Sequence, residues 1–155
     1  MSRLWIMRHG EAAPGAPDSA RRLTPLGEQQ AATMARRLAQ HQADGEPAVT
    51  RIITSPFVRA RQTAGVMGEA LGLGVETLSG ITSDDSPQAF CDWLVGQSGN
   101  LLMISHMPLV GALAGLLLEG RHDQGMAFPT AGIAELDADV WAGGCARLVR
   151  FNAPD

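Results

Sequence analysis

The chain contains no lysine. All 12 of its basic residues are arginines, set against 16 acidic residues, so the net charge is −4. An acidic chain of this kind is a poor candidate for nucleic-acid binding, which needs a basic surface to meet the phosphates. Arginine binds phosphate with a planar, two-pronged geometry that lysine lacks. Each arginine is therefore worth considering as a phosphate ligand.

Cysteine and long apolar runs are scarce as well. Cys91 and Cys145 are isolated and lack metal-type spacing, so we interpret them as reduced thiols of a cytoplasmic protein. The apolar run over residues 113–118 is far too short to span a membrane, and charged residues interrupt the first apolar run, so no signal peptide is expected. Because no repeat or linker interrupts the chain, residues 1–155 are expected to form one monomeric domain.

Strand and helix patterns alternate along the chain. Apolar or β-branched runs predict strands over residues 4–7, 49–54, 75–78, 101–104, 133–136 and 147–151. One helical pattern begins at residue 25 and ends near residues 41–45. Three others cover residues 57–71, 87–95 and 108–118. This order predicts an α/β fold of three layers, α/β/α, with a mainly parallel central sheet and the last strands antiparallel at an edge.

The first helix has a clear start. Thr24 suits the N-cap, and Pro25 suits the first helical position. Leu26, Met34 and Leu38 recur at a helical spacing. We therefore expect these three side chains to form the buried face of that helix.

Polar residues follow three of the predicted parallel strands. Arg8 and His9 follow the first strand, Ser55 and Arg59 follow the second, and His106 follows the strand over 101–104. The carboxyl ends of parallel strands meet at one edge of a sheet, where ligands bind. Arg59 also falls in the first turn of a helix, where backbone N–H groups favour anions. Two imidazoles and two guanidiniums at this edge predict a pocket for a phosphoryl group, with the Ser55 hydroxyl as a further candidate contact.

Two histidines raise the alternative of a metal site. Such a site needs a third ligand, and the sequence offers no histidine pair at helical spacing and no cysteine cluster nearby. His41 and His122 lie in polar, loop-like surroundings, and we interpret both as solvated or structural. We therefore expect neither a metal nor another cofactor.

The residues Met7–Ala12 resemble the Arg-His-Gly signature of the histidine phosphatase superfamily, whose fold is phosphoglycerate mutase-like. Other stretches resemble its short branch, the SixA-type phosphohistidine phosphatases. These stretches are residues 21–27, 55–63, 104–111 and 128–134. Together they span nearly the whole chain.

The resemblance implies roles for individual residues. His9 is the expected nucleophile, which attacks phosphorus and forms a phosphohistidine intermediate that water then hydrolyses. Arg8, Arg59 and His106 are expected to hold the phosphoryl oxygens, so that positioning and charge supply most of the catalysis. Arg21 matches a further phosphate-binding arginine of the SixA-type pattern.

The roles of two other arginines remain open. Arg22 stands directly beside Arg21 and competes with it for the same role. Arg61 lies two residues beyond Arg59, about 200° around the helix. We therefore interpret Arg61 as a surface or ion-pair residue.

The chain departs from the wider superfamily at the acid that protonates the leaving group. The matching position is Gly80, and the nearby Asp84 and Asp85 are the remaining candidates, although a solvated turn is the favoured interpretation of both. A leaving alkoxide needs a general acid. A phosphorylated imidazole can instead take a proton on its second nitrogen and leave neutral. The departure therefore favours phosphohistidine as the substrate.

The short chain points the same way. Only 46 residues separate Arg59 from His106, and they leave no insertion for a lid. An open site could admit phosphohistidine on a folded partner protein of the phosphotransfer or phosphocarrier type, in signal transduction.

Two alternatives stay open: a small-molecule phosphomonoesterase on the same fold, and a non-catalytic module that binds phosphate or a phosphoprotein. A mutase is disfavoured because it needs an enclosed site.

Overall fold

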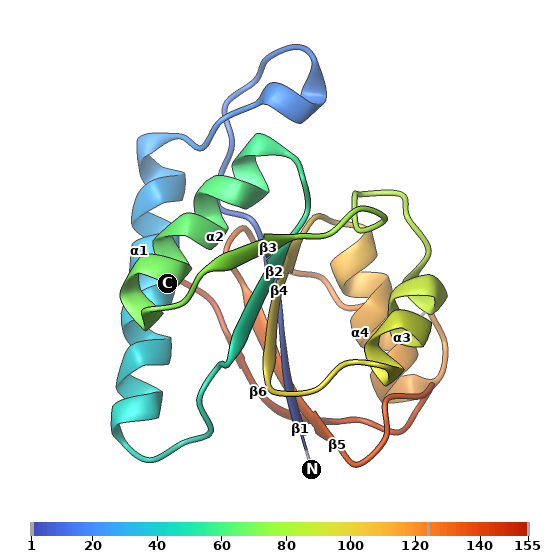
Figure 1. The fold of residues 1–155 in the computed structure, drawn as a ribbon. Coiled ribbons are helices and arrows are strands. Elements are labelled where there is room, and N and C mark those ends of the chain that lie inside the picture. Colours follow the sequence, from blue (N-terminus) through green and yellow to red (C-terminus); the bar gives the residue numbers. More distant parts are fainter. Residues whose placement is uncertain (1, 124, 155) are drawn as a thin grey trace.

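The computed structural model describes residues 2–123 and 125–154. Within these residues six strands form one sheet in the order β3-β2-β4-β1-β5-β6 (Figure 1). The strands are β1 (Ser2–Arg8), β2 (Arg51–Thr54), β3 (Val75–Thr77), β4 (Leu101–Ser105), β5 (Ile133–Ala138) and β6 (Arg147–Asn152). The first four run parallel, β5 is antiparallel to β1, and β6 is antiparallel to β5. The predicted sheet and its antiparallel edge are confirmed.

Helices cover both faces of this sheet. In Figure 1, α1 (Pro25–Ala43) and α2 (Val58–Leu71) lie on one side, and α3 (Pro87–Val95) and α4 (Leu109–Glu119) lie on the other. None of the helices within the described residues is both long and apolar enough to cross a bilayer.

The buried strand β1 contributes side chains to both apolar cores. Leu4 and Ile6 belong to the cluster on the α3 and α4 side, whereas Trp5 and Met7 belong to the cluster on the α1 and α2 side. Successive side chains of a strand point to opposite faces of the sheet. A continuous apolar run therefore fills two cores and holds the polar residues that follow it in a rigid position.

Helix α1 begins as predicted, but its buried face is different. The Thr24 hydroxyl accepts a hydrogen bond from Gly27 N–H at 3.0 Å, and Pro25 occupies the first turn. The expectation for Leu26 is wrong, because this side chain is 50% exposed. Gly27, one residue and about 100° further on, faces the protein instead. The buried face consists of Gly27, Ala31, Met34, Ala35 and Leu38.

The reason lies in a close contact between α1 and the loop after β1. A Cβ atom on Gly27 would lie 2.1 Å from the carbonyl oxygen of Glu11, and one on Gly10 would lie 2.5 Å from the carbonyl oxygen of Gly27. Both neighbours are backbone atoms, which cannot rotate away as a flexible side chain would. The start of α1 therefore packs directly on the turn that follows His9.

This contact predicts a clear difference between two glycines. Gly27→Ala is expected to lower the free energy of unfolding by about 1–3 kcal/mol, because the backbone of Glu11 must move. Gly65→Ala is the matched control on α2, where a Cβ would meet nothing within 4 Å. That change is expected to raise stability by about 0.5–1 kcal/mol through helix propensity. Urea unfolding of both variants tests this, and equal effects would contradict the contact.

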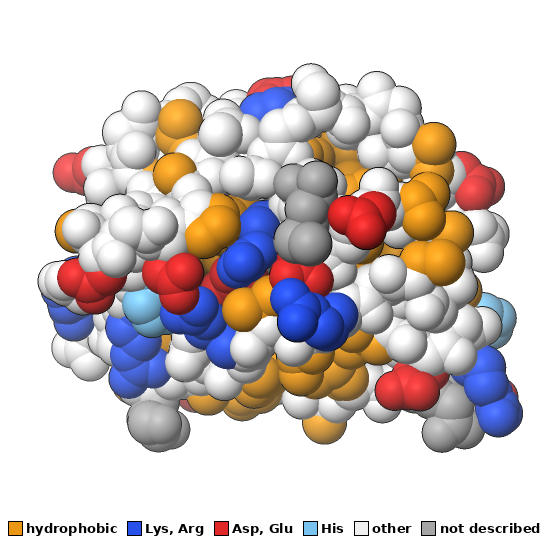
Figure 2. Space-filling view, turned by 90° about the horizontal axis from the view of Figure 1, so that it is seen from below, with side chains coloured by type: hydrophobic (Ala, Val, Ile, Leu, Met, Phe, Trp, Pro, Cys, Tyr) orange, Lys and Arg blue, Asp and Glu red, His pale blue; other side chains and the backbone are white. Residues whose placement is uncertain are grey.

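The surface at the amino ends of the parallel strands carries side chains of both charges. Figure 2 shows this end, where arginine and acidic side chains are interspersed. Arg3, near the start of β1, pairs with Glu135, and Arg150 pairs with both Glu135 and Glu46. Arg3 and Arg150 are therefore neutralised by their acidic partners at this end.

Candidate functional site

The predicted strand ends converge at the carboxyl edge of the sheet. β1 and β4 are neighbours, with Arg8 opposite Ser105 in the register. The backbone N–H of His9 donates to the carbonyl of Ser105 at 3.0 Å. His9 and His106 therefore lie side by side, with 5.1 Å between their ring centroids.

The ring of His9 is held in one orientation. Its Nδ1 lies 2.7 Å from the carbonyl oxygen of Gly10, so Nδ1 carries the proton and donates it. Nε2 is then free to accept, and it lies 3.3 Å from Nε of Arg59. Burial, aided by the nearby arginine charges and opposed by the hydrogen bond to Gly10, lowers the pKa of His9 to about 4. His9 is thus a neutral imidazole near pH 7 with a lone pair on Nε2.

His106 is neutral for the same reason. Burial lowers its pKa to about 3, and the charges of His9 and Arg59 contribute. Its Nε2 lies 2.7 Å from Oγ of Ser55, a hydroxyl that also accepts from Phe57 N–H at 3.2 Å. Its Nδ1 is buried and has no partner within the described part of the chain. Ser55 therefore contacts His106, and Nδ1 is the nitrogen that remains for a ligand.

The two predicted arginines flank the histidines. Arg59 is 4% exposed, and all three of its side-chain nitrogens have partners: Nε donates to His9, Nη1 to the carbonyl of Asp18 at 2.8 Å, and Nη2 to the Asp18 carboxylate at 3.2 Å. Arg8 donates from Nη1 to the carbonyl of Phe128 at 2.8 Å. Its Nε is buried without a partner among the described residues. Burial lowers the pKa of Arg8, and the charge of Arg59 adds to this.

Arg21 approaches the pocket less directly than the prediction assumes. Its Nη1 donates to the Asp18 carboxylate at 3.1 Å, and its Nε donates to a carbonyl of its own loop. Its charge is one of those that lower the pKa of His9. Arg22 and Arg61 are both exposed. Of the adjacent pair Arg21 and Arg22, the structure brings Arg21 toward the histidines.

The candidate acids lie in a turn. Gly80 has a φ of +84°, which favours glycine. Asp84 is exposed. Asp85 accepts from both the hydroxyl and the N–H of Thr82 at 2.7 Å, and these bonds lower the pKa of Asp85. A carboxyl that is held ionised in this way is poorly suited to donate a proton.

Asp18 is the site residue that sequence reasoning missed. Its carboxylate bridges Arg21 and Arg59, and it belongs to the short helix η1 (Asp18–Ala20) within the loop between β1 and α1. The sequence carried one signal, an aspartate three residues before Arg21, but loop composition alone did not indicate that the loop returns to α2.

Glu11 and Thr63 support the turn that follows His9. The Glu11 carboxylate accepts from the hydroxyl of Thr24 at 2.7 Å, the same hydroxyl that caps α1. The Thr63 hydroxyl accepts from Gly10 N–H at 3.1 Å. Both residues hold the turn that supplies the carbonyl partner of His9.

The lowered pKa of His9 predicts an acid-dependent stability. The unfolded histidine takes up its proton near pH 6.5, whereas the folded one does so only near pH 4. The neutral side chain therefore contributes stability above pH 6.5 that is lost as the pH falls toward 4, on the order of 2 kcal/mol by pH 5. Urea unfolding between pH 7 and 4.5 measures this loss. His9→Gln should show a shallower dependence, and an identical slope in both proteins would contradict the lowered pKa.

No metal-type cluster accompanies the pocket. Within residues 2–123 and 125–154, no group of three or more histidine, cysteine, aspartate or glutamate side chains is arranged to hold a metal ion. The charges available to a ligand at the strand ends are those of arginine.

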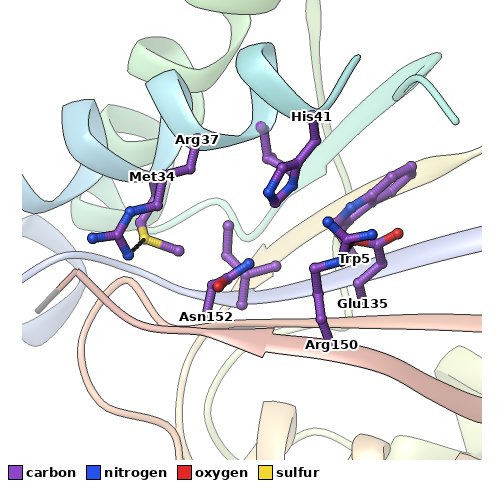
Figure 3. Close-up of a pocket in the computed structure, with 9 residues that line it drawn as sticks. Trp5, Met34, Arg37, His41, Glu135, Arg150 and Asn152 are labelled. Carbon is purple, nitrogen blue, oxygen red and sulfur yellow. Dashed lines mark hydrogen bonds and ion pairs between the residues drawn. The ribbon is translucent and has the colours of Figure 1, made fainter. Parts of the chain in front are cut away.

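A separate small cavity lies between α1 and the sheet (Figure 3). Its volume of about 10 Å³ suits a single water molecule rather than a substrate. Trp5 Nε1 and His41 Nδ1 are buried there without a partner among the described residues. The lining residues are Trp5, Met34, Arg37, Leu38, His41, Ile133, Glu135, Arg150 and Asn152. This cavity is too small to hold a substrate.

Sequence comparison finds related proteins over most of the chain. The model of the histidine phosphatase superfamily (branch 1) matches residues 4–82. A Haemophilus influenzae protein named phosphohistidine phosphatase SixA homolog is 33% identical, with 97% of this chain and 94% of the relative covered. The phosphohistidine phosphatase SixA of Escherichia coli is 34% identical, with 88% of this chain and 86% of the relative covered.

Solved structures show the same fold. The protein histidine phosphatase SixA complexed with tungstate superposes with a TM-score of 0.84 at 31% identity, covering 98% of this chain and 97% of that one. A mycobacterial glucosyl-3-phosphoglycerate phosphatase superposes with a TM-score of 0.75 at 19% identity, covering 97% and 99% of the two chains. The second likeness is one of fold alone.

Proposed function

The chain belongs to the histidine phosphatase superfamily, and on that premise we propose that it is a metal-independent phosphatase that hydrolyses phosphohistidine on a protein. The observation that carries the proposal is the neutral ring of His9, with Nδ1 held by the carbonyl of Gly10 and Nε2 beside Arg59. The names of the SixA relatives support the choice of phosphohistidine as substrate.

The proposed reaction proceeds in two steps. His9 Nε2 attacks phosphorus in line with the bond that breaks, and a phosphohistidine forms on His9. Arg8, Arg59 and His106 bind the three equatorial oxygens, with Arg21 as a further positive charge at the rim. Water then attacks the phosphorus and releases phosphate. The unpartnered Arg8 Nε and His106 Nδ1 support these assignments, because buried polar groups normally have a partner.

The nature of the leaving group favours phosphohistidine over an ester. Asp84 is exposed and Asp85 is held by Thr82, so neither supports protonation of a leaving alkoxide. Between Arg59 and His106 the described chain forms only the rest of α2, then β3, α3 and β4 with their loops. This brevity supports an open site for a protein partner of the phosphotransfer or phosphocarrier type. Action in signal transduction, a monomeric single domain and a cytoplasmic location remain predictions.

A small-molecule phosphomonoesterase is the second candidate. The fold is shared with a glucosyl-3-phosphoglycerate phosphatase, and the same histidines and arginines could serve an ester. The two candidates differ in the acid that an alkoxide requires.

A substrate panel tests the proposal. The purified protein is given a histidine phosphotransfer domain phosphorylated on histidine, a phosphorylated phosphocarrier protein, a sugar phosphate and p-nitrophenyl phosphate. We expect the highest kcat/KM on one of the two phosphohistidine proteins, by at least about tenfold over the sugar phosphate. A higher kcat/KM on the sugar phosphate would refute the proposal. Tight phosphate binding without turnover of any substrate would favour a binding module.

A further inference from the structure

We propose that Asp18 is a further catalytic residue of this pocket: its carboxylate accepts a hydrogen bond from the N–H of the substrate's phosphorylated imidazole and keeps that ring protonated while the phosphoryl group departs. The inference rests on the proposed function. It also assigns the task of activating the leaving group, for which the turn at Gly80 offers no acid.

Asp18 and His9 share one edge of the same guanidinium. Nε and Nη2 of Arg59 form the edge that binds carboxylates and phosphates with two parallel hydrogen bonds. Nε donates to His9 Nε2 at 3.3 Å, and Nη2 donates to Asp18 Oδ2 at 3.2 Å. The nucleophile and the carboxylate thus accept from adjacent nitrogens of one rigid group, so a phosphoryl group bound there lies beside both.

Asp18 lies on the side from which a substrate enters. Its side chain is 58% exposed, whereas that of Arg59 is 5% exposed and His9 is 7% exposed. The loop that carries it projects beyond α1 and α2 at the top of Figure 1. In-line attack by His9 puts the leaving nitrogen on the far side of phosphorus. For a protein-borne phosphohistidine this is the solvent side, next to Asp18.

The carboxylate remains anchored after a phosphoryl oxygen takes its place on Arg59 Nη2. Asp18 Oδ1 accepts from Arg21 at 3.1 Å, and the Asp18 backbone carbonyl accepts from Arg59 Nη1 at 2.8 Å. These two contacts involve neither Asp18 Oδ2 nor Nη2. The displaced oxygen, Oδ2, therefore stays at the rim of the pocket and is available to a donor on the substrate.

Asp18 is suited to accept a hydrogen bond from the substrate rather than to donate a proton to it. The hydrogen bond from Arg21, followed by that from Arg59, lowers the pKa of Asp18. The carboxylate is consequently ionised at neutral pH and is an acceptor only. Such a group cannot protonate an alkoxide. Its charge-assisted hydrogen bond can, however, stabilise the protonated form of a substrate imidazole.

The step balances without a proton donor. The bond between phosphorus and the substrate nitrogen breaks, and its electron pair returns to the substrate ring. At the same time His9 Nε2 forms the new bond to phosphorus. The proton on the second nitrogen of the substrate ring stays in place, so the imidazole leaves neutral. A ring without that proton would have to leave as an anion, which is a much poorer leaving group.

The test compares Asp18→Asn with the unchanged protein on two substrates. One is the phosphorylated histidine phosphotransfer domain, and the other is p-nitrophenyl phosphate, whose leaving group has no imidazole. Asp18→Asn is expected to lower kcat on the phosphotransfer domain by about tenfold or more, the scale of one charge-assisted hydrogen bond. On p-nitrophenyl phosphate, kcat/KM should stay unchanged or rise, because the carboxylate no longer competes for Arg59. Glu76→Gln is the control, since Glu76 is 52% exposed and pairs with Arg51 on β2 and β3.

The pH profile separates this role from a structural one. Asp18→Asn should move the alkaline limb of kcat on the phosphotransfer domain to lower pH, because the substrate ring then loses its proton more readily. In Asp18→Glu, which keeps a carboxylate, the alkaline limb should stay close to its position in the unchanged protein, even if kcat falls. The pKa of His9 is lowered to about 4 and that of His106 to about 3, well below the alkaline limb, and arginine stays protonated throughout. The charged and titratable groups that act on Asp18 or feel its charge are Arg21, Arg59 and His106.

Each outcome decides a different point. Equal losses on both substrates in Asp18→Asn, or an alkaline limb that does not move, would overturn the role of Asp18. An unchanged protein that hydrolyses p-nitrophenyl phosphate but not the phosphotransfer domain would overturn the proposed function itself.

Discussion

His9→Ala is expected to abolish turnover of phosphohistidine, with a fall in kcat of at least about 10⁴-fold, because the variant lacks the atom that bonds to phosphorus. The fold should survive the change. The backbone of His9 keeps its bonds to Ser105 and Ala131, and only the side-chain bonds to Gly10 and Arg59 are lost. Turnover of the phosphorylated phosphotransfer domain measures the effect, and circular dichroism verifies the fold.

The matched control for His9 is His41→Ala. His41 lies in the last turn of α1, beside the small cavity of Figure 3, and this variant should keep its turnover. Samples quenched in detergent at alkaline pH, where the acid-labile phosphohistidine survives, provide a second readout, since the phosphoryl label should be found on the unchanged protein and be absent from His9→Ala. Residual turnover in folded His9→Ala close to that of the control would rule out the proposed nucleophile.

Arg59→Ala is expected to lower kcat/KM by about 10³-fold, the scale of an arginine that stabilises charge in phosphoryl transfer. Arg59 is buried, and its Nε lies directly beside His9 Nε2. The variant therefore loses both a ligand for the phosphoryl oxygens and the donor next to the nucleophile. Steady-state kinetics with the phosphorylated phosphotransfer domain give the measurement.

Arg61→Ala provides the comparison on the same helix. Arg61 is exposed, so its removal changes the net charge by the same amount without touching the pocket. We expect less than a threefold change in kcat/KM for this variant. Similar losses for Arg59→Ala and Arg61→Ala would mean that overall charge, rather than the placement of Arg59, governs the reaction.

The sheet and the central site residues were predictable because their signals are local. An apolar run that ends in Arg8 and His9 marks both a buried strand and the edge where it stops. The same holds for β4 and His106. Because parallel strands share one carboxyl edge, these local signals predict that His9 and His106 lie close together, although they are nearly 100 positions apart in the chain. The distance of 5.1 Å between their ring centroids confirms this.

The remaining contacts depend on geometry that no local pattern carries. Asp18 reaches Arg59 across 41 positions because its loop returns over the start of α2. Leu26 appeared apolar enough for the core, but the backbone contact at Gly27 sets the rotation of α1 and turns Leu26 to solvent. The hydroxyl of Ser55 contacts His106, 51 positions further along the chain, and no local pattern indicates that partner. In each case the deciding atom belongs to a distant segment.

The hydrogen bond from His9 Nδ1 to the carbonyl of Gly10 has a thermodynamic consequence for the proposed route. It keeps the phosphorylated enzyme ring protonated, which is the same chemical state in which the substrate ring delivers its phosphoryl group. Donor and enzyme then carry nearly equal group-transfer potentials, so the first transfer is close to thermoneutral and runs readily in both directions. Hydrolysis becomes the only strongly downhill step, and the net flux depends on how water competes with a returning imidazole.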